Sequence, residues 1–192
     1  MVTSTLINEQ RRQQFLSVME ESEWDLLLLY GHSWRKDFFR SLVNFSFFGP
    51  HAVAALSRSG ELSLLMSHPW DQELLAGTID ARVQWTPDFR TGLGRLTTQS
   101  PNSKTAIAGM ELMEAQFVAG APASATSIVE ELRRFKTPAE IETARKAARL
   151  ADDLRRRPQR EQQLIGMNER PSIGAISCQR HAGSYRWYVG SH

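Results

Sequence analysis

The sequence has few cysteines and no long apolar runs, which are typical of secreted and membrane proteins. It contains one cysteine, Cys178, among 192 residues, which excludes an intramolecular disulfide framework and is typical of a reducing compartment. The longest apolar run, residues 26–30, is far too short to cross a membrane. Residues 1–15 contain no apolar stretch of the length that a signal peptide requires. We therefore expect a cytoplasmic protein with no membrane partner.

Charge is distributed unevenly along the chain. Residues 1–132 contain 10 Lys and Arg against 15 Asp and Glu, whereas residues 133–192 contain 13 against 6. A basic tail on an acidic domain is one pattern of nucleic-acid-binding proteins. A solvated segment that was never selected as a folded unit gives the same pattern. A nucleic-acid partner is therefore kept as an alternative only.

The spacing of apolar residues near the N-terminus predicts a helix followed by a strand. Phe15 and Met19 share one face of the predicted helix over residues 8–22, and Arg11 is expected largely off that face. Residues 24–30 form an almost continuous apolar run, which is typical of a strand buried on both faces. A helix followed by such a strand indicates an α/β fold.

The same patterns predict further elements along the chain. Strands are expected at residues 51–57, 61–66, 82–85 and 104–108, helical segments at residues 69–76, 111–119 and 127–134, and a turn or short helix at residues 38–43. The first two strands flank a turn at residues 58–60 and form the clearest β-hairpin. Residues 89–98 stay ambiguous, because Gly92 and Gly94 disfavour a helix.

The best helix start lies in the last third of the chain. Thr137 suits the N-cap, Pro138 suits the first helical position, and Glu140 completes a capping box. A short basic hinge, residues 133–137, precedes this helix. Pro158, after three consecutive arginines, is expected to break it.

Residues 132–150, LRRFKTPAEIETARKAARL, resemble the R-x-x-K-[ST]-P-x-E-[IL]-x-x-x-R-K-A segment of the creatinase, prolidase and Xaa-Pro aminopeptidase family of M24-type metallopeptidases. The matched residues include Lys136, Thr137, Pro138, Glu140, Ile141, Arg145, Lys146 and Ala147. In that family the segment joins an N-terminal α/β domain to the catalytic domain. Looser matches in the same order extend the resemblance over about residues 10–153.

The resemblance implies a fold and a domain organisation. Residues 1–132 would form a creatinase- or prolidase-type N-terminal domain, with a mixed central sheet flanked by helices. Residues 133–137 would be the hinge. Residues 138–192 would be the start of a truncated or frame-shifted catalytic domain, a hinge helix followed by an irregular tail. A divergent natural tail is the alternative.

The chemistry of the family belongs to the catalytic domain, where two Asp, one His and two Glu hold two divalent metals, usually manganese, cobalt or zinc. Such oxygen-rich ligands suit hard ions, and two-metal sites activate water for hydrolysis. The last aspartate of this sequence is Asp153. The possible ligands after it are Glu161, Glu169, Cys178, His181 and His192. Because two aspartates are missing, we expect no metal, no cofactor and no catalytic residue in this chain.

An aromatic stretch provides the candidates for a substrate lip or a subunit interface, because N-terminal domains of the family reach over the active site of the partner subunit. The candidates are Trp34, Arg35, Phe45, Phe47, Phe48 and His51. For Trp34 and Arg35 the alternative is a surface loop with a packed ring and an ion pair to Asp37. For the phenylalanines it is core packing, and for His51 an ordinary position at the start of a strand.

The function predicted from the sequence is that of a non-catalytic N-terminal domain of an Xaa-Pro peptidase- or creatinase-like metallohydrolase. Its role would be homodimer formation and shaping of the partner's substrate pocket, with peptide substrates in full-length relatives. Two alternatives are an active metal-dependent Xaa-Pro peptidase or C–N hydrolase in a full-length form, and a nucleic-acid binder that uses the basic tail.

Overall fold

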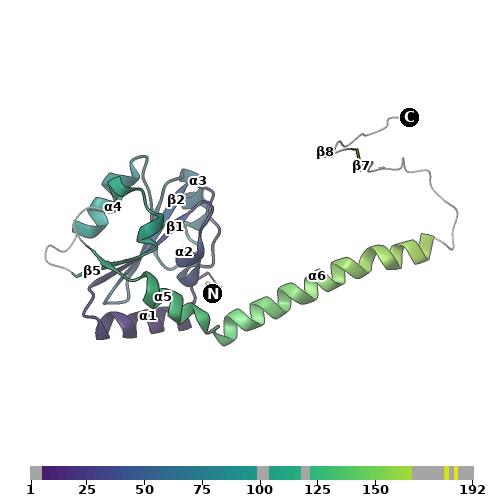
Figure 1. Cartoon of the computed structure of the whole chain (residues 1–192), viewed down its shortest axis with the longest axis horizontal. Helices are drawn as coiled ribbons and strands as arrows, with labels where there is room; N and C mark the ends of the chain where they lie inside the picture. Colours follow the sequence, from purple (N-terminus) through teal and green to yellow (C-terminus); the bar gives the residue numbers. More distant parts are fainter. Residues whose placement is uncertain (1–5, 99–103, 118–121, 166–179, 182–183, 186–192) are drawn as a thin grey trace. The chain divides into compact units, whose positions relative to one another are not determined.

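The computed structural model describes residues 6–98, 104–117, 122–165, 180–181 and 184–185. It divides into two compact units, residues 1–141 and residues 142–192. The first unit contains the central sheet and the helices that cover it (Figure 1). Among the described residues, the second unit contains α6 from residue 142 onward and a short pair of strands.

Six strands form the sheet of the first unit in the order β4-β3-β2-β1-β5-β6. The strands are β1 (Leu26–His32), β2 (His51–Ser57), β3 (Leu62–Met66), β4 (Arg82–Trp85), β5 (Thr105–Ala108) and β6 (Ala123–Ser124). β2 pairs antiparallel with β1 and with β3, whereas the other neighbouring pairs are parallel. β1, β3, β4 and β5 therefore end at the same end of the sheet, where β2 begins.

Helices cover both faces of this sheet. They are α1 (Glu9–Glu21), α2 (Asp37–Leu42), α3 (Pro69–Leu75), α4 (Phe89–Thr98) and α5 (Thr126–Arg134). Two 3-10 turns, η1 (Met110–Leu112) and η2 (Ala115–Phe117), follow β5, and three residues separate the end of α5 from the start of α6 (Pro138–Ile165). The predicted α/β fold with a mixed central sheet flanked by helices is confirmed.

The hydrophobic core has one layer on each face of the sheet. Along β1, Leu27 and Leu29 belong to one layer, and Leu28 and Tyr30 belong to the other. Helices α1, α2, α3 and α5 cover the first layer with Phe15, Met19, Phe38, Phe39, Leu42, Leu75 and Val129. Helix α4 covers the second layer with Phe89, Leu93 and Leu96. Burial on both faces explains the continuous apolar run of β1.

α4 forms despite the two glycines that made residues 89–98 ambiguous. The carboxylate of Asp88 accepts a hydrogen bond from the backbone N–H of Thr91 at 3.1 Å, as a helix cap does. A Cβ at Gly92 would lie 2.7 Å from Cγ2 of Thr86, so the absence of a side chain permits close packing of α4 on the sheet.

The predicted helix over residues 111–119 is wrong. Gly109 has a left-handed φ of 84°, and Met113, with φ −81° and ψ 146°, is extended, so the chain forms only the two 3-10 turns. Residues 118 and 119 lie outside the described residues. Strand β6 was not predicted, because two residues are too few to show an alternating pattern.

The expectation that Arg11 lies off the buried face of α1 is also wrong. Arg11 is 0% exposed and lies on the same helix face as Phe15 and Met19. Its positive charge suggested a solvent-facing position, but its spacing of four residues from Phe15 is that of a shared helix face. The partners that make this burial possible come from the distant α5–α6 junction.

α6 begins as the sequence predicts and ends later. The Thr137 N–H donates to the Glu140 carboxylate at 2.7 Å, and the Glu140 N–H donates to the Thr137 hydroxyl at 3.2 Å, so the capping box is confirmed. The helix continues through Pro158 to Ile165, against the prediction of a break. Pro158 has no backbone N–H, so the helix continues there without one of its hydrogen bonds, among arginine, glutamine and leucine residues that are good helix formers.

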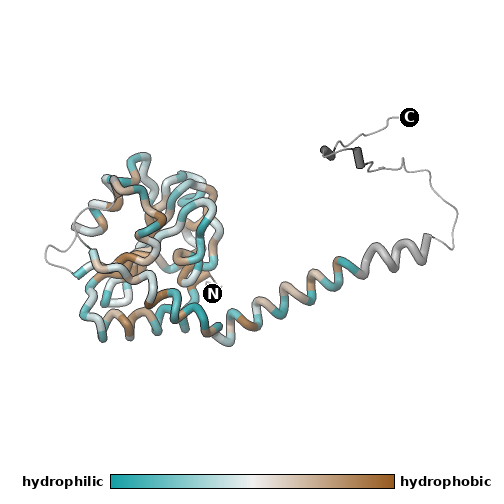
Figure 2. The backbone as a smooth tube through the Cα atoms, in the orientation of Figure 1, coloured by the Kyte–Doolittle hydropathy of each residue, from teal (hydrophilic) through white to brown (hydrophobic). Residues whose placement is uncertain are grey.

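Hydrophobic and hydrophilic residues alternate along the first part of α6 (Figure 2). Within the described residues, no helix has both the length and the apolar character needed to cross a membrane. The last described strands, β7 (Arg180–His181) and β8 (Ser184–Tyr185), pair antiparallel in a part of the chain that was expected to be irregular.

One edge of the sheet is formed by the four-residue strand β4. The backbone N–H of Trp85, the last residue of β4, donates to the side-chain oxygen of Gln72 at 3.0 Å. Gln72 belongs to α3, which also packs on this strand.

Candidate interaction surface

The fold brings the six predicted site residues to one region. Trp34 and Arg35 follow β1, the three phenylalanines precede β2, and His51 opens β2, where it pairs in register with His32. All six therefore lie at or near the end of the sheet where β1 ends and β2 begins. The region separates into exposed and buried side chains.

Trp34 is presented to solvent by a tight and well-bonded turn. Its residue is 88% exposed. The turn is closed by reciprocal backbone hydrogen bonds between His32 and Arg35 at 2.8 and 2.9 Å, and the Ser33 N–H donates to the Pro50 carbonyl at 2.9 Å. Arg35 forms an exposed ion pair with Asp37 at 3.4 Å. A ring held out of the core by a fixed backbone is available for contact with another molecule.

The three phenylalanines differ in exposure. Phe47 is 0% exposed and packs edge-on against Phe39 with ring centroids 5.2 Å apart, so it is a core residue. Phe45 is half-buried against the same core layer. Phe48 is 69% exposed. The interpretation of Phe47 as part of an exposed surface is therefore wrong, and the alternative of core packing holds for that ring.

A buried carboxylate that the sequence did not single out positions Phe48. Asp71 is 0% exposed and accepts hydrogen bonds from the backbone N–H groups of Phe48 at 2.7 Å and Gly49 at 2.9 Å. Nothing about Asp71 in the sequence distinguishes it from an ordinary acidic residue in the first turn of a helix. Its two hydrogen bonds fix the backbone from which the Phe48 ring projects.

Two further exposed tryptophans lie at the same end of the sheet and were missed by the sequence analysis. Trp70, next to Asp71 in α3, is 64% exposed, and Trp85 at the end of β4 is 42% exposed. We call Trp34, Phe48, Trp70 and Trp85 the aromatic edge. The sequence does contain a signal for them: Trp70 stands at the start of a predicted helix, and Trp85 stands at the end of a short predicted strand.

His51 is enclosed by aromatic rings and does not belong to the exposed surface. Its side chain is 12% exposed, and the Tyr30 hydroxyl lies 2.7 Å from its Nδ1. The rings of Phe89 and Phe117 have centroids 5.2 and 5.1 Å from that of His51. The carboxylate of Glu114 lies 3.6 Å from its Nε2.

This enclosure affects both titratable partners. Burial lowers the pKa of His51, an effect that Glu114 opposes and His32 reinforces. Burial, with the negative charge of Glu114, raises the pKa of Tyr30 to about 12. A neutral imidazole and a protonated phenol form a stable hydrogen-bonded pair at pH 7, which suits a packing role better than proton transfer.

Within the described residues, no group of three or more His, Cys, Asp or Glu is placed to hold a metal ion. The side chains of Glu161, Glu169, Cys178, His181 and His192 lie outside the described part of the chain. The family's metals therefore stay an expectation for full-length relatives.

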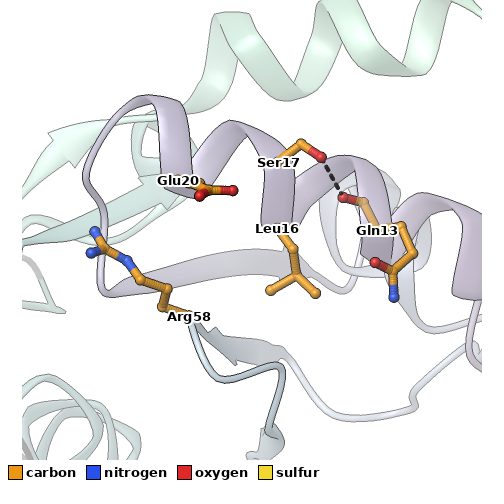
Figure 3. A pocket seen from close by; sticks show the side chains of 5 residues that line it. All are labelled: Gln13, Leu16, Ser17, Glu20 and Arg58. Atoms are coloured by element: carbon orange, nitrogen blue, oxygen red, sulfur yellow. Dashed lines mark hydrogen bonds between the residues drawn. The ribbon is translucent and has the colours of Figure 1, made fainter.

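The described surface also contains a hollow of about 410 Å³ between α1 and the turn that follows β2 (Figure 3). It is lined by Gln13, Leu16, Ser17, Glu20 and Arg58. The Ser17 hydroxyl donates to the backbone of its own helix at Gln13, and the Arg58 guanidinium is paired with Asp25 at 3.3 Å. Because the Ser17 hydroxyl and the Arg58 guanidinium already have partners within the chain, we assign no ligand to this hollow.

Comparison with known proteins identified solved structures only: no family model matches the sequence, and no curated protein matches it. The prolidase from Pyrococcus furiosus is 18% identical with a TM-score of 0.50, covering 72% of this chain and 40% of that chain. The Pyrococcus horikoshii OT3 prolidase is 12% identical with a TM-score of 0.50, covering 75% of this chain and 40% of that chain. An Xaa-Pro aminopeptidase from Streptococcus thermophilus is 14% identical with a TM-score of 0.48, covering 65% of this chain and 97% of that chain.

At these identities the comparison concerns the fold. This chain spans about 40% of the length of each prolidase. The fold implied by the resemblance of residues 132–150 is thereby confirmed: this chain shares its α/β fold with part of the prolidases.

Proposed function

We propose that this chain is the non-catalytic N-terminal domain of an Xaa-Pro peptidase- or creatinase-like metallohydrolase, and that it self-associates through the aromatic edge. In a dimer, the exposed rings of one subunit would help to shape the substrate pocket of its partner. The activity itself would belong to a catalytic domain in full-length relatives.

The observation that carries this proposal is the agreement between a sequence motif and its place in the fold. Residues 132–150 resemble the segment that follows the N-terminal domain in the metallopeptidase family. They begin at the end of α5 and form the start of α6, directly after a sheet of the kind found in prolidases. The capping box from Thr137 to Glu140 gives the motif a structural reason.

Self-association is supported by the size of the aromatic edge. At about 200 Å² for each aromatic side chain, its exposed fractions leave roughly 500 Å² of aromatic surface in water. Exposed apolar areas of this size, about 300–600 Å², often mark a functional surface, and an interface of standard size buries about 800 Å² on each partner. Tryptophan and phenylalanine are also enriched at interface cores.

The rigidity of the region supports the same role. Hydrogen bonds to Asp71 fix the backbone of Phe48, and the bond from Ser33 to the Pro50 carbonyl fixes the turn that holds Trp34. Side chains on a fixed backbone lose less conformational freedom when they bind. The aromatic edge is thus prepared for contact before a partner arrives.

The test is to replace the two most exposed rings, Trp34→Ser with Phe48→Ser, and to measure molecular mass by light scattering and sedimentation. We expect the unmodified chain to be dimeric at about 100 μM, well above a dissociation constant of about 1 μM. We expect the double variant to be monomeric with an unchanged melting midpoint, because neither ring belongs to the core.

Phe135→Ser is the matched control, since Phe135 is 73% exposed but lies in the α5–α6 junction rather than on the aromatic edge. It should remain dimeric. A monomeric unmodified chain at the higher concentration would refute self-association. A dimer that survives the double replacement would place the interface elsewhere.

A further inference from the structure

The junction between α5 and α6 is held by one buried arginine of α1, which lies more than 120 residues earlier in the sequence. Arg11 of α1 is 0% exposed. Its guanidinium donates to the backbone carbonyl of Leu132 in the last turn of α5 and to that of Phe135 at 3.1 Å. It also donates to the carboxylate of Glu140, in the first turn of α6, at 2.7 Å. One side chain thus bonds to the end of one helix, the connecting residue and the start of the next helix.

The chemistry of arginine suits this arrangement. A planar guanidinium has five N–H donors in a fixed fork, and it bonds acceptors in different directions without moving. Here the two terminal nitrogens bond to the three junction groups, and one of them also donates to the side-chain oxygen of Gln14 at 2.9 Å. A lysine at the same position has three donors on a single nitrogen and fits fewer of these acceptors.

The carboxylate of Glu140 connects the two helix starts. One of its oxygens accepts from the Thr137 N–H in the capping box and from Arg11. The other oxygen lies 3.3 Å from the side-chain nitrogen of Asn8, which caps α1 through the Arg11 N–H at 3.1 Å. The geometry that starts α6 is therefore coupled to the geometry that starts α1.

The junction has little other anchorage of its own. Phe135 is 73% exposed, and Arg134 and Lys136 are exposed as well. Arg133 adds a long contact to Asp37 at 3.9 Å and lies over the Phe38 ring at 5.6 Å. The side chains of residues 134–136 are exposed and that of Thr137 is buried, so the backbone carbonyls of Leu132 and Phe135, bonded to Arg11, are a main tie between the junction and the rest of the domain.

We infer that Arg11 is a positioning residue that makes residues 133–141 a fixed joint rather than a flexible hinge. The sequence predicts a hinge at residues 133–137, and hinges work by absorbing backbone rotation. A joint whose carbonyls are held by a buried cation resists such rotation. This inference goes beyond the proposed function and does not depend on it, because it concerns the junction and not the aromatic edge.

Limited proteolysis of the full chain with trypsin tests the inference, because the exposed Arg134 and Lys136 are cleavage sites within the joint. Arg11→Met removes every donor while keeping an apolar side chain, and Arg12→Met is the matched control one position along α1. Losing hydrogen bonds from a charged donor should raise cleavage at the joint by about tenfold or more, at a temperature well below the melting midpoint. The control should cleave at the unmodified rate.

Distance measurements between two spin labels give a readout that does not depend on the overall free energy of unfolding. The labels replace exposed residues, Ser17→Cys on α1 and Ala139→Cys in the first turn of α6, in a Cys178→Ser background. We expect one narrow distance distribution in the unmodified chain and in Arg12→Met, and a broadened one in Arg11→Met. Unchanged cleavage together with a narrow distribution in Arg11→Met would overturn the inference.

A milder variant decides the question if Arg11→Met does not fold. Glu140→Gln keeps the capping box, which accepts glutamine, and removes only the charge that faces Arg11. Its control is Glu142→Gln, two residues along α6. Faster cleavage in Glu140→Gln than in its control supports the joint, and equal cleavage with equal distance distributions overturns it.

Discussion

The contrast between Phe47 and Phe48 provides the sharpest test of the structure, because neighbouring identical residues are placed in opposite environments. Phe47 is fully buried and Phe48 is 69% exposed. The Phe47 ring contacts Phe39 edge-on, and Lys36 lies over it at 4.9 Å. A Cβ added at Gly31 would lie 3.0 Å from the same ring, so the site is tightly packed.

The expected magnitudes follow from this packing. Replacing a buried phenylalanine by alanine removes its transfer free energy and leaves a cavity, which together lower the free energy of unfolding by about 3–5 kcal/mol. Phe47→Ala should lose about that amount, a large fraction of the roughly 5–15 kcal/mol of a typical domain. Phe48→Ala changes an exposed side chain and should alter the same quantity by no more than about 0.5 kcal/mol.

Urea denaturation followed by tryptophan fluorescence measures both variants, at a protein concentration at which both are monomeric. The slope of the unfolding free energy against urea should stay the same, so that the shift in midpoint reports stability alone. A loss below about 1 kcal/mol for Phe47→Ala would contradict the assignment of this ring to the core. A loss above about 2 kcal/mol for Phe48→Ala would show that this ring is packed in solution.

Three further predictions concern acidity, activity and chain length. Because burial lowers the pKa of His51, the unfolded state binds more protons than the folded state just below about pH 6.5. The free energy of unfolding should therefore fall as the pH decreases through that region. In His51→Gln the urea midpoint should depend less on pH. Purified protein with added manganese, cobalt or zinc should not cleave an Xaa-Pro dipeptide, and metal-dependent turnover in a clean preparation would disprove this. A chain ending at Ile141 should have the melting midpoint of the full chain. A chain ending at Arg134 should have a lower midpoint, because it lacks Glu140, the partner of buried Arg11. Equal midpoints for the two chains would show that this ion pair is dispensable.

Much of the fold was predictable from the sequence because it depends on local pattern. The continuous apolar run of β1, the hairpin of β2 and β3 and the capping box of α6 are each encoded within a few residues. The helix predicted over residues 111–119 failed because Met113 is extended and ends the first 3-10 turn, a break that the spacing of apolar residues does not indicate.

The candidate site was less predictable because exposure depends on contacts between distant residues. Residues 45–48 belong to no strand or helix, so no period indicates which rings point inward. Asp71 bonds to a backbone that lies 22 and 23 residues earlier in the chain. Arg11 bonds to groups more than 120 residues away, although its spacing from Phe15 would have indicated a buried position if charge had been given less weight than period.

The hydrogen bond from Trp85 to Gln72 has a consequence for how this protein aggregates. An open edge strand is a template to which a further strand adds, and natural proteins block such edges with short strands and side-chain partners. β4 has only four residues, and its last backbone donor is already occupied by a side chain from α3. This donor is thus occupied only while α3 stays folded, so partial unfolding of α3 on heating would open the end of β4 next to two tryptophans. Gln72→Ala should therefore aggregate at lower temperature than the unmodified chain, which turbidity during a thermal ramp would measure.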